Sequence, residues 1–106
     1  MTPKLSLLYT TFPNEEEASR ICRLLLEKRL VACVNVLGKI KSLYFWEEQL
    51  EESQEVAVLL KTTYEKVSDV IETLQNLHPY ETPAIVEIPI ERGGKSFFKW
   101  VQDSVR

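Results

Sequence analysis

The spacing of apolar and polar residues divides this chain into alternating strand-like and helix-like segments. Short runs rich in strand formers recur along its length, and stretches with apolar residues every three to four positions separate them. Read in order, the pattern predicts a strand at 4–12, a helix at 15–30, strands at 31–46 and 55–62, a helix ending at Leu77 or His78, a strand at 84–91 and a last helix that Ser96 caps.

Each predicted helix has a start signal and one apolar face. Asn14 is suited to an N-cap with Glu17 three residues later, and Thr62 with Glu65 repeats this spacing. The apolar faces are Ala18, Ile21, Cys22 and Leu25 in the first helix, Val67, Val70, Ile71 and Leu74 in the second, and Phe97, Trp100, Val101 and Val105 in the third. Cys22 lies inside such a face, which favours a buried thiol over a ligand.

The order of these elements predicts an α+β fold of the ferredoxin-like, split βαβ type, in a single domain over residues 1–106. Right-handed crossovers place the first two helices on one face of an antiparallel sheet with strand order 4-1-3-2. Pro89 cannot donate a ladder hydrogen bond, so the last strand is expected at an edge. Gly38 is expected to mark a bulge.

The length of the second strand predicts an oligomer. About 14 residues span roughly 46 Å, whereas a domain of this size has a diameter of roughly 34 Å. The acidic segment 47–53 is read as a solvated hairpin loop, which leaves the third strand much shorter than the second. Tyr44, Phe45 and Trp46 should then project beyond the domain as apolar surface that a partner must cover, in a closed homo-oligomer.

Composition excludes several classes of function. The chain has 106 residues and a formal net charge of −3, which disfavours a nucleic-acid-binding protein. No apolar run is long enough to span a membrane. The N-terminal residues lack the features of a signal peptide, so a cytoplasmic protein with reduced thiols at Cys22 and Cys33 is expected.

The segment from His78 to Pro83 is the strongest candidate for a site. It holds the only histidine, and prolines at 79 and 83 stiffen it into an extended corner. The imidazole of His78 and the carboxylate of Glu81 are suitable ligands for copper or another divalent cation. Two ligands do not complete a site, so other segments or a neighbouring chain must supply the rest.

Five segments, in order and at matching spacing, resemble the CutA family of divalent-cation tolerance proteins over essentially the whole chain. They are Tyr9–Asn14, Leu30–Asn35, Ser42–Glu47, Leu60–Thr63 and His78–Pro83. The resemblance implies a ferredoxin-like fold, a tight homotrimer and a response to metal ions with possible copper binding, with no cofactor required for folding. Thr10 stands where some relatives have cysteine, and Ala84 where many have glutamate.

Two kinds of function follow from these observations. One is a non-catalytic, metal-responsive trimer. The other, by analogy with PII proteins, is a sensor that binds a small anionic ligand between subunits, with Lys61, Tyr80 and Trp46 in the cleft and Cys33 as a further cleft candidate. An enzyme is disfavoured, because the chain has neither a recognisable nucleophile–base arrangement nor a phosphate-binding glycine loop.

Overall fold

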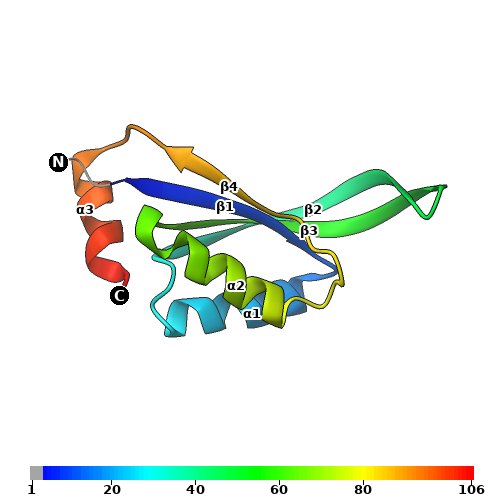
Figure 1. The fold of residues 1–106 in the computed structure, drawn as a ribbon, viewed down its shortest axis with the longest axis horizontal. Coiled ribbons are helices and arrows are strands. Elements are labelled where there is room, and N and C mark those ends of the chain that lie inside the picture. Colours follow the sequence, from blue (N-terminus) through cyan, green and yellow to red (C-terminus); the bar gives the residue numbers. More distant parts are fainter. Residues whose placement is uncertain (1–3) are drawn as a thin grey trace.

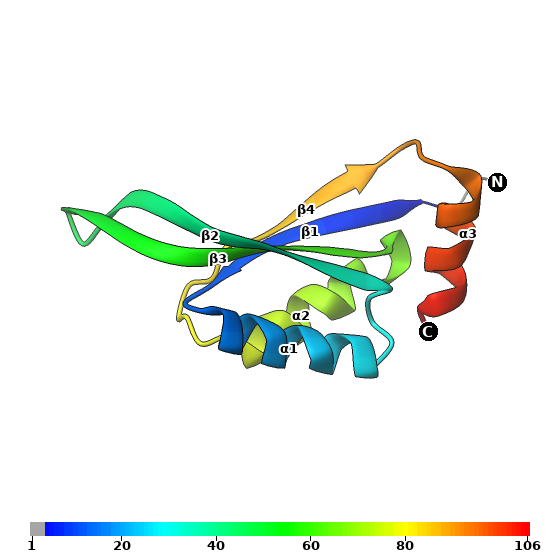
Figure 2. The same ribbon diagram turned by 180° about the vertical axis from the view of Figure 1, so that it is seen from behind.

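A computed structural model describes residues 4–106, and its four strands form one antiparallel sheet with the order β2-β3-β1-β4. The sheet packs on two helices that lie side by side on one face (Figures 1 and 2). The elements are β1 (Leu5–Phe12), α1 (Glu15–Glu27), β2 (Cys33–Trp46), β3 (Gln49–Thr63), a single 3₁₀ turn (Tyr64–Lys66), α2 (Val67–Leu77), β4 (Ile85–Ile90) and α3 (Lys95–Ser104). The predicted fold class and strand order are confirmed.

The main core lies between the sheet and helices α1 and α2. The apolar faces predicted for these helices are confirmed, since every one of their positions is buried except Ile71, which packs against the cluster partly exposed. Alternate residues of the strands, such as Leu8, Val58 and Leu60, complete the cluster from the sheet. This period of two leaves the intervening strand residues on the other face of the sheet.

The start of α1 is as predicted, but its end is not. The Asn14 side chain accepts a hydrogen bond from the Glu17 backbone N–H at 2.8 Å. The helix ends at Glu27 rather than Leu30, because Arg29 has a φ of 60° and the Leu30 N–H turns back to the Leu25 carbonyl at 3.1 Å. This is a Schellman-type ending, and no glycine signals it in the sequence.

The predicted caps of the other two helices are wrong. The Thr62 hydroxyl donates to the Leu30 carbonyl at 2.6 Å, because β3 continues through Thr63 and a 3₁₀ turn precedes α2. Gly94, not Ser96, precedes α3. In both places the tertiary structure extends an element past a local capping signal.

The face that helix α3 buries matches the predicted one only in part, since Val101 is buried and Val105 packs beside it as predicted. Phe98 and Val101 pack with Leu5 in a second, smaller cluster, whereas Phe97 and Trp100 are exposed and lie against each other with ring centroids 5.9 Å apart. The helix covers one end of the sheet instead of lying across its face (Figure 1). A short helix in this position needs only a narrow apolar face.

The β2–β3 hairpin projects well beyond the rest of the molecule, as its length predicts (Figure 1). The principal extents are 48 × 25 × 22 Å. The prediction of a loop at 47–53 is wrong, because pairing continues to Trp46 opposite Gln49. Only Glu47 and Glu48 form the turn, with φ angles of 50° and 65°, as in a two-residue type I′ turn. The whole hairpin, rather than one unpaired strand, therefore projects.

Two further predictions concern irregular positions in the sheet, and both are confirmed. The β2–β3 register shifts between Val36 and Gly38, and Gly38 has a φ of 106°. Strand β4, which contains Pro89, is an edge strand. The sheet face away from α1 and α2 carries an apolar strip in which Val86 and Ile88 are about half exposed, at 50% and 46%.

Candidate functional site

His78 lies at the end of α2 and is held on all sides by the chain itself. Its ring stacks on Phe12 with centroids 4.6 Å apart and planes inclined by 8°. Nε2 donates to the Thr11 carbonyl at 2.8 Å, and Nδ1 accepts from the Tyr80 backbone N–H at 3.2 Å. These partners specify the neutral imidazole with its proton on Nε2. Burial lowers the pKa of His78, which agrees with this state.

The surroundings of His78 bear directly on metal binding. A metal ion at this ring would have to replace one of its two hydrogen bonds. The Thr10 hydroxyl is fully buried and 3.4 Å from Nε2. Over residues 4–106 the structure brings together no group of three histidine, cysteine, aspartate or glutamate side chains that could hold a metal.

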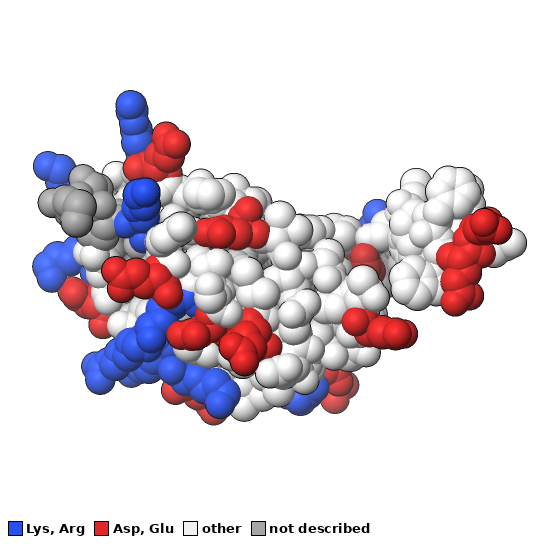
Figure 3. All heavy atoms as spheres, viewed as in Figure 1, with Lys and Arg blue, Asp and Glu red and all other residues white. Residues whose placement is uncertain are grey.

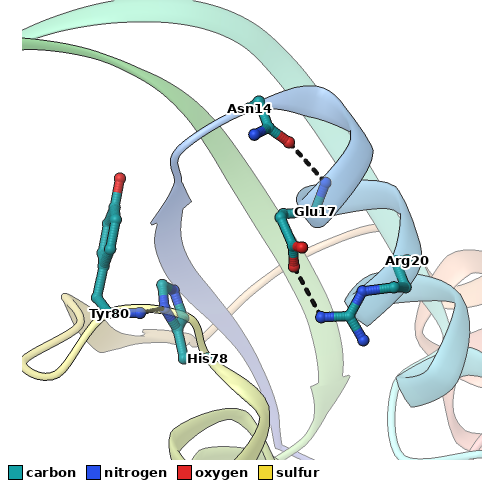
Figure 4. Close-up of polar contacts among 5 residues, drawn as sticks. All are labelled: Asn14, Glu17, Arg20, His78 and Tyr80. Atoms are coloured by element: carbon teal, nitrogen blue, oxygen red, sulfur yellow. Dashed lines mark hydrogen bonds and ion pairs between the residues drawn. The ribbon is translucent and has the colours of Figure 1, made fainter.

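Tyr80 lies between His78 and a cleft, because its ring packs against the imidazole with centroids 5.0 Å apart and planes inclined by 40°. Figure 4 shows the hydroxyl end of its side chain directed away from His78. It lines a cleft of about 660 Å³, here called the hairpin cleft, between the corner after α2 and one face of the hairpin as far as Trp46 beside the turn. The lining residues are Thr11, Pro13, Tyr44, Trp46, Glu51, Ser53, Gln54, Glu55, Tyr80, Glu81, Thr82 and Ala84.

Glu55 is a cleft residue with a hydrogen bond to each carboxylate oxygen, and the sequence analysis missed it. One carboxylate oxygen accepts from the Thr11 hydroxyl at 3.0 Å and the other from the Ser42 hydroxyl at 2.5 Å. Burial, and then a hydrogen bond to this carboxylate, raise the pKa of the Tyr80 phenol well above its usual value. A signal was present in the sequence: Glu51, Ser53 and Glu55 recur every two residues, which places them on one face of a strand.

The predicted site residues therefore divide into three places. Tyr80, Trp46 and Glu81 line the hairpin cleft, whereas His78 does not. Lys61 lies elsewhere on the sheet, where its Nζ donates to Asn35 at 2.6 Å and lies 5.6 Å from the centre of the Phe97 ring. Within one chain Lys61 therefore does not line the hairpin cleft, and its place in a cleft between subunits stays a prediction.

The two cysteines are free thiols. Cys22 is buried in the core, and this burial raises its pKa to about 11. Cys33 is opposite Lys61 in the β2–β3 register; burial raises its pKa and the nearby ammonium partly offsets that effect. Neither thiol has the lowered pKa that marks a reactive cysteine.

The two ends of the molecule differ in charge. Acidic side chains cluster at the tip of the hairpin, and in the same view lysines and arginines gather near the opposite end of the molecule (Figure 3). Among residues 4–106, no helix has both the length and the apolar character needed to cross a membrane.

The fold and the corner together define a class of protein: a ferredoxin-like α+β chain with a long projecting hairpin and a rigid His-Pro corner at its base. A sequence model of the CutA1 divalent ion tolerance protein matches residues 6–104. The chain belongs to the CutA family.

Individual relatives support this assignment. The divalent-cation tolerance protein CutA of Thermotoga maritima is 46% identical over 93% of this chain and 97% of its own length. The CutA homolog of Xenopus laevis is 45% identical over 95% of this chain and 67% of its own. The solved structure of a CutA from Archaeoglobus fulgidus, named as a periplasmic divalent cation tolerance protein, is 44% identical with a TM-score of 0.93 and covers 96% and 99% of the two chains.

Proposed function

We propose that this protein acts in the tolerance of divalent cations as a homotrimer that catalyses no reaction. The membership of the CutA family carries the proposal, since relatives that match nearly end to end are named for divalent-cation tolerance and their names carry no enzymatic activity. A cytoplasmic location is part of the proposal.

The exposed apolar surface supports the trimer. Five large hydrophobic side chains at the end of the hairpin are exposed, with Phe45 at 73% and Leu50 at 69%; the others are Leu43, Tyr44 and Trp46. A second apolar strip lies on the open sheet face. Contiguous surface of this kind in a free monomer favours aggregation unless a neighbouring copy covers it. A closed arrangement in which each hairpin lies on the next subunit would cover both surfaces.

The metal part of the proposal assigns copper or another divalent cation to His78 and Glu81. The two residues belong to the same rigid corner, one in the core and one in the hairpin cleft. An ion that uses both would displace a hydrogen bond of the imidazole and recruit further ligands from a neighbouring subunit. Imidazole and carboxylate ligands suit copper and zinc.

Calorimetric titration with Cu²⁺ tests the metal assignment. We expect saturable binding by the wild type and at least a tenfold loss of affinity in both His78→Gln and Glu81→Gln. Glu72→Gln, which alters an exposed carboxylate on α2, is the matched control and should bind as the wild type does. Unchanged affinity in His78→Gln would remove this residue from the metal site.

The Thr10 hydroxyl offers a gain-of-binding test. Because Thr10 lies beside the His78 ring, Thr10→Cys places a thiol within reach of Nε2. We expect this variant to bind copper more tightly than the wild type, and Thr10→Ser to behave as the wild type. Equal affinities in all three proteins would show that the pair does not contribute to metal binding.

Sedimentation analysis at micromolar concentration tests the assembly. We expect a single species of three chains, and partial dissociation in Phe45→Ser, which removes the most exposed aromatic ring of the hairpin. Lys66→Ser, far from the hairpin at the start of α2, is the control. A wild-type protein that sediments as a monomer would refute the trimer.

A further inference from the structure

We propose that the Glu55 carboxylate clamps the projecting hairpin at a fixed angle to the body of the molecule, and that this angle allows the chain to close into a symmetric assembly. This role rests on the proposed homotrimer and names the side chains that set its geometry. It depends on contacts within one chain, and neither on a metal ion nor on surface that a neighbouring subunit covers.

Glu55 lies where the sheet narrows from four strands to two. The β1–β3 ladder ends at the pair of Phe12 and Val56, so Glu55 is the first residue of β3 beyond it. From there to the turn, β3 pairs with β2 alone, and Figure 1 shows these two strands continuing past β1 and β4. A two-stranded ribbon twists more strongly than a wider sheet and is only marginally stable by itself. Backbone pairing therefore fixes the direction of the hairpin only weakly.

The bulge in β2 adds a second place at which the hairpin can bend. The register shifts between Val36 and Gly38, and Gly38 lies opposite Ala57, two residues from Glu55 on β3. A bulge bends its strand and increases the local twist. Side-chain contacts must therefore select one direction from the range that the backbone allows.

The two oxygens of Glu55 join the hairpin to the body. One accepts a hydrogen bond from the Thr11 hydroxyl on β1 at 3.0 Å, and the other accepts one from the Ser42 hydroxyl on β2 at 2.5 Å. The Tyr80 phenol, from the corner after α2, also hydrogen-bonds to this carboxylate. Hydrogen bonds to an ionised carboxylate are shorter and about twice as strong as those between neutral groups. One side chain thus connects β1, both strands of the hairpin and the corner.

The anchor on the side of the body is rigid. Thr11 is buried, and its carbonyl accepts a hydrogen bond from Nε2 of His78 at 2.8 Å. The adjacent Phe12 is fully buried and stacks on the same imidazole. By contrast, the hydroxyls of Tyr44 and Ser53, which are 3.3 Å apart, join the two hairpin strands only to each other. The Glu55 clamp therefore links the direction of the hairpin to the packing of the core.

The angle of the hairpin matters because a closed ring allows little variation in it. Each subunit of a cyclic trimer must meet the next at the same rotation, and a contact at another angle leaves the ring open or continues into a filament. A hairpin without the clamp would present the same apolar residues over a range of angles. Loss of the clamp should therefore weaken closure of the trimer more than it weakens the fold of the chain.

Sedimentation velocity over a range of protein concentrations tests the clamp. Urea below the unfolding transition brings dissociation of the trimer into the measurable range. Thr11→Val and Ser42→Ala each remove one hydroxyl, and we expect each to raise the dissociation constant of the trimer at least threefold. The double variant, and Glu55→Ala separately, should raise it at least tenfold. Far-UV circular dichroism verifies that each variant is folded.

Ser6 supplies the matched control. Its hydroxyl donates to the Glu87 carboxylate at 2.7 Å, and it is a fully buried residue of β1 like the other members of the body. Ser6→Ala thus removes the same kind of bond from the same strand, away from the hairpin. It should lower the urea concentration at which the chain unfolds and leave the dissociation constant of the trimer unchanged.

A double-mutant cycle distinguishes the clamp from a direct contact between Glu55 and a neighbouring subunit. If the hydroxyls act through Glu55, Thr11→Val should have no further effect on the trimer once Glu55→Ala is present. Glu55→Gln keeps the shape of the side chain and one acceptor oxygen, and its amide can donate to a hydroxyl. This variant should therefore assemble more nearly like the wild type than Glu55→Ala does.

Three results would overturn the proposal. Trimers of Thr11→Val and Ser42→Ala that dissociate like those of the wild type would show that the clamp does not control closure. An equal effect of Thr11→Val with and without Glu55 would show that the hydroxyl acts independently of the carboxylate. A monomeric wild type would refute the homotrimer and with it this role of Glu55, whereas a trimeric wild type with unaffected variants refutes the clamp alone.

Discussion

The two ends of the β2–β3 ladder differ in whether the rest of the chain packs against their side chains. Near Val58 and Leu60 the ladder is part of the body of the molecule, where α1 and α2 cover one face and the side chains are buried. From Ser42 to Ser53 it forms the projecting hairpin, where Leu43, Phe45 and Leu50 are exposed. The same backbone pairing runs through both. Backbone hydrogen bonds therefore continue a strand beyond the core, but they do not cover its side chains.

Polar groups show the same contrast. In the body, His78 has a partner for each ring nitrogen, and over residues 4–106 no buried side-chain nitrogen or oxygen lacks a hydrogen-bond partner. In the hairpin, aromatic rings and carboxylates face an open cleft. A satisfied group such as His78 contributes to folding, whereas surface that the chain leaves uncovered is available for association or binding.

Truncation of leucines gives the largest expected difference between the two regions. Leu74→Ala removes a fully buried side chain of α2, and we expect it to lower the free energy of unfolding by about 2–5 kcal/mol in urea denaturation. The Leu50 side chain on the hairpin is 69% exposed. Leu50→Ala should therefore change the free energy of unfolding of an isolated chain by less than about 0.5 kcal/mol.

The same pair of variants tests coverage of the hairpin. If neighbouring subunits bury Leu50, the loss of stability caused by Leu50→Ala should grow with protein concentration. The loss of stability caused by Leu74→Ala should persist at every concentration. A loss in Leu50→Ala that equals the loss in Leu74→Ala at all concentrations would contradict the distinction between body and hairpin.

Acidification should destabilise the body through His78. Burial lowers the pKa of His78 in the folded state below its ordinary value of 6.5, so the unfolded chain takes up the proton first. This contribution is fully present above pH 6.5 and is lost as the pH falls below it, with a slope of up to about 1.4 kcal/mol per pH unit. Denaturation between pH 7 and pH 5 measures it.

His78→Gln is the control for this pH dependence. It removes the titrating group, and the slope in this window should fall to the level set by the carboxylates. An equal slope in wild type and variant would show that His78 does not titrate differently on folding.

At the Gly38 bulge, between the two regions, a substitution should change stability through backbone conformation and not through side-chain packing. Gly38 has a φ of 106°, and a Cβ added there would meet nothing within 4 Å. Gly38→Ala should therefore cost about 1–2 kcal/mol of stability through strain, not through a clash. Gly94→Ala, where the space is also open and φ is negative, should change stability by less than about 0.5 kcal/mol.

Substitutions at the tip of the hairpin should give a small gain in stability. Glu47 and Glu48 both have positive φ, which asparagine and glycine adopt more readily. We expect the double change Glu47→Asn with Glu48→Gly to stabilise the hairpin by about 0.5–1 kcal/mol in thermal denaturation. Glu47→Gln with Glu48→Gln removes the same charges, and a gain of equal size in that control would assign the effect to repulsion.

Much of the fold could be predicted because local patterns specify it. The period of the apolar residues in α1 and α2 defined both buried faces, and the order of elements defined the sheet. The errors fell where tertiary contacts outweigh local signals. Thr62 caps nothing because β3 continues past it, and α3 buries Phe98 at the end of the sheet, beside Leu5 and Gly93.

The candidate site was predictable only in part. The corner after α2 was recognised from its prolines, and the structure places Tyr80, Glu81 and Trp46 around one cleft. Glu55 was missed, because a carboxylate at the start of a predicted strand looks like any exposed residue. Lys61, predicted for a cleft between subunits, lies opposite Leu7 and Cys33 in the register and outside the hairpin cleft of a single chain.

The sequence by itself determined the family, the element order and the buried faces of α1 and α2, because these depend on residue types at short and regular spacings. The tertiary structure alone decided that His78 faces inward onto Phe12 while Tyr80 faces outward toward Glu55. The reason is geometric: these partners are distant along the chain, and only the packing of α2 against the sheet brings the corner between β1 and the hairpin.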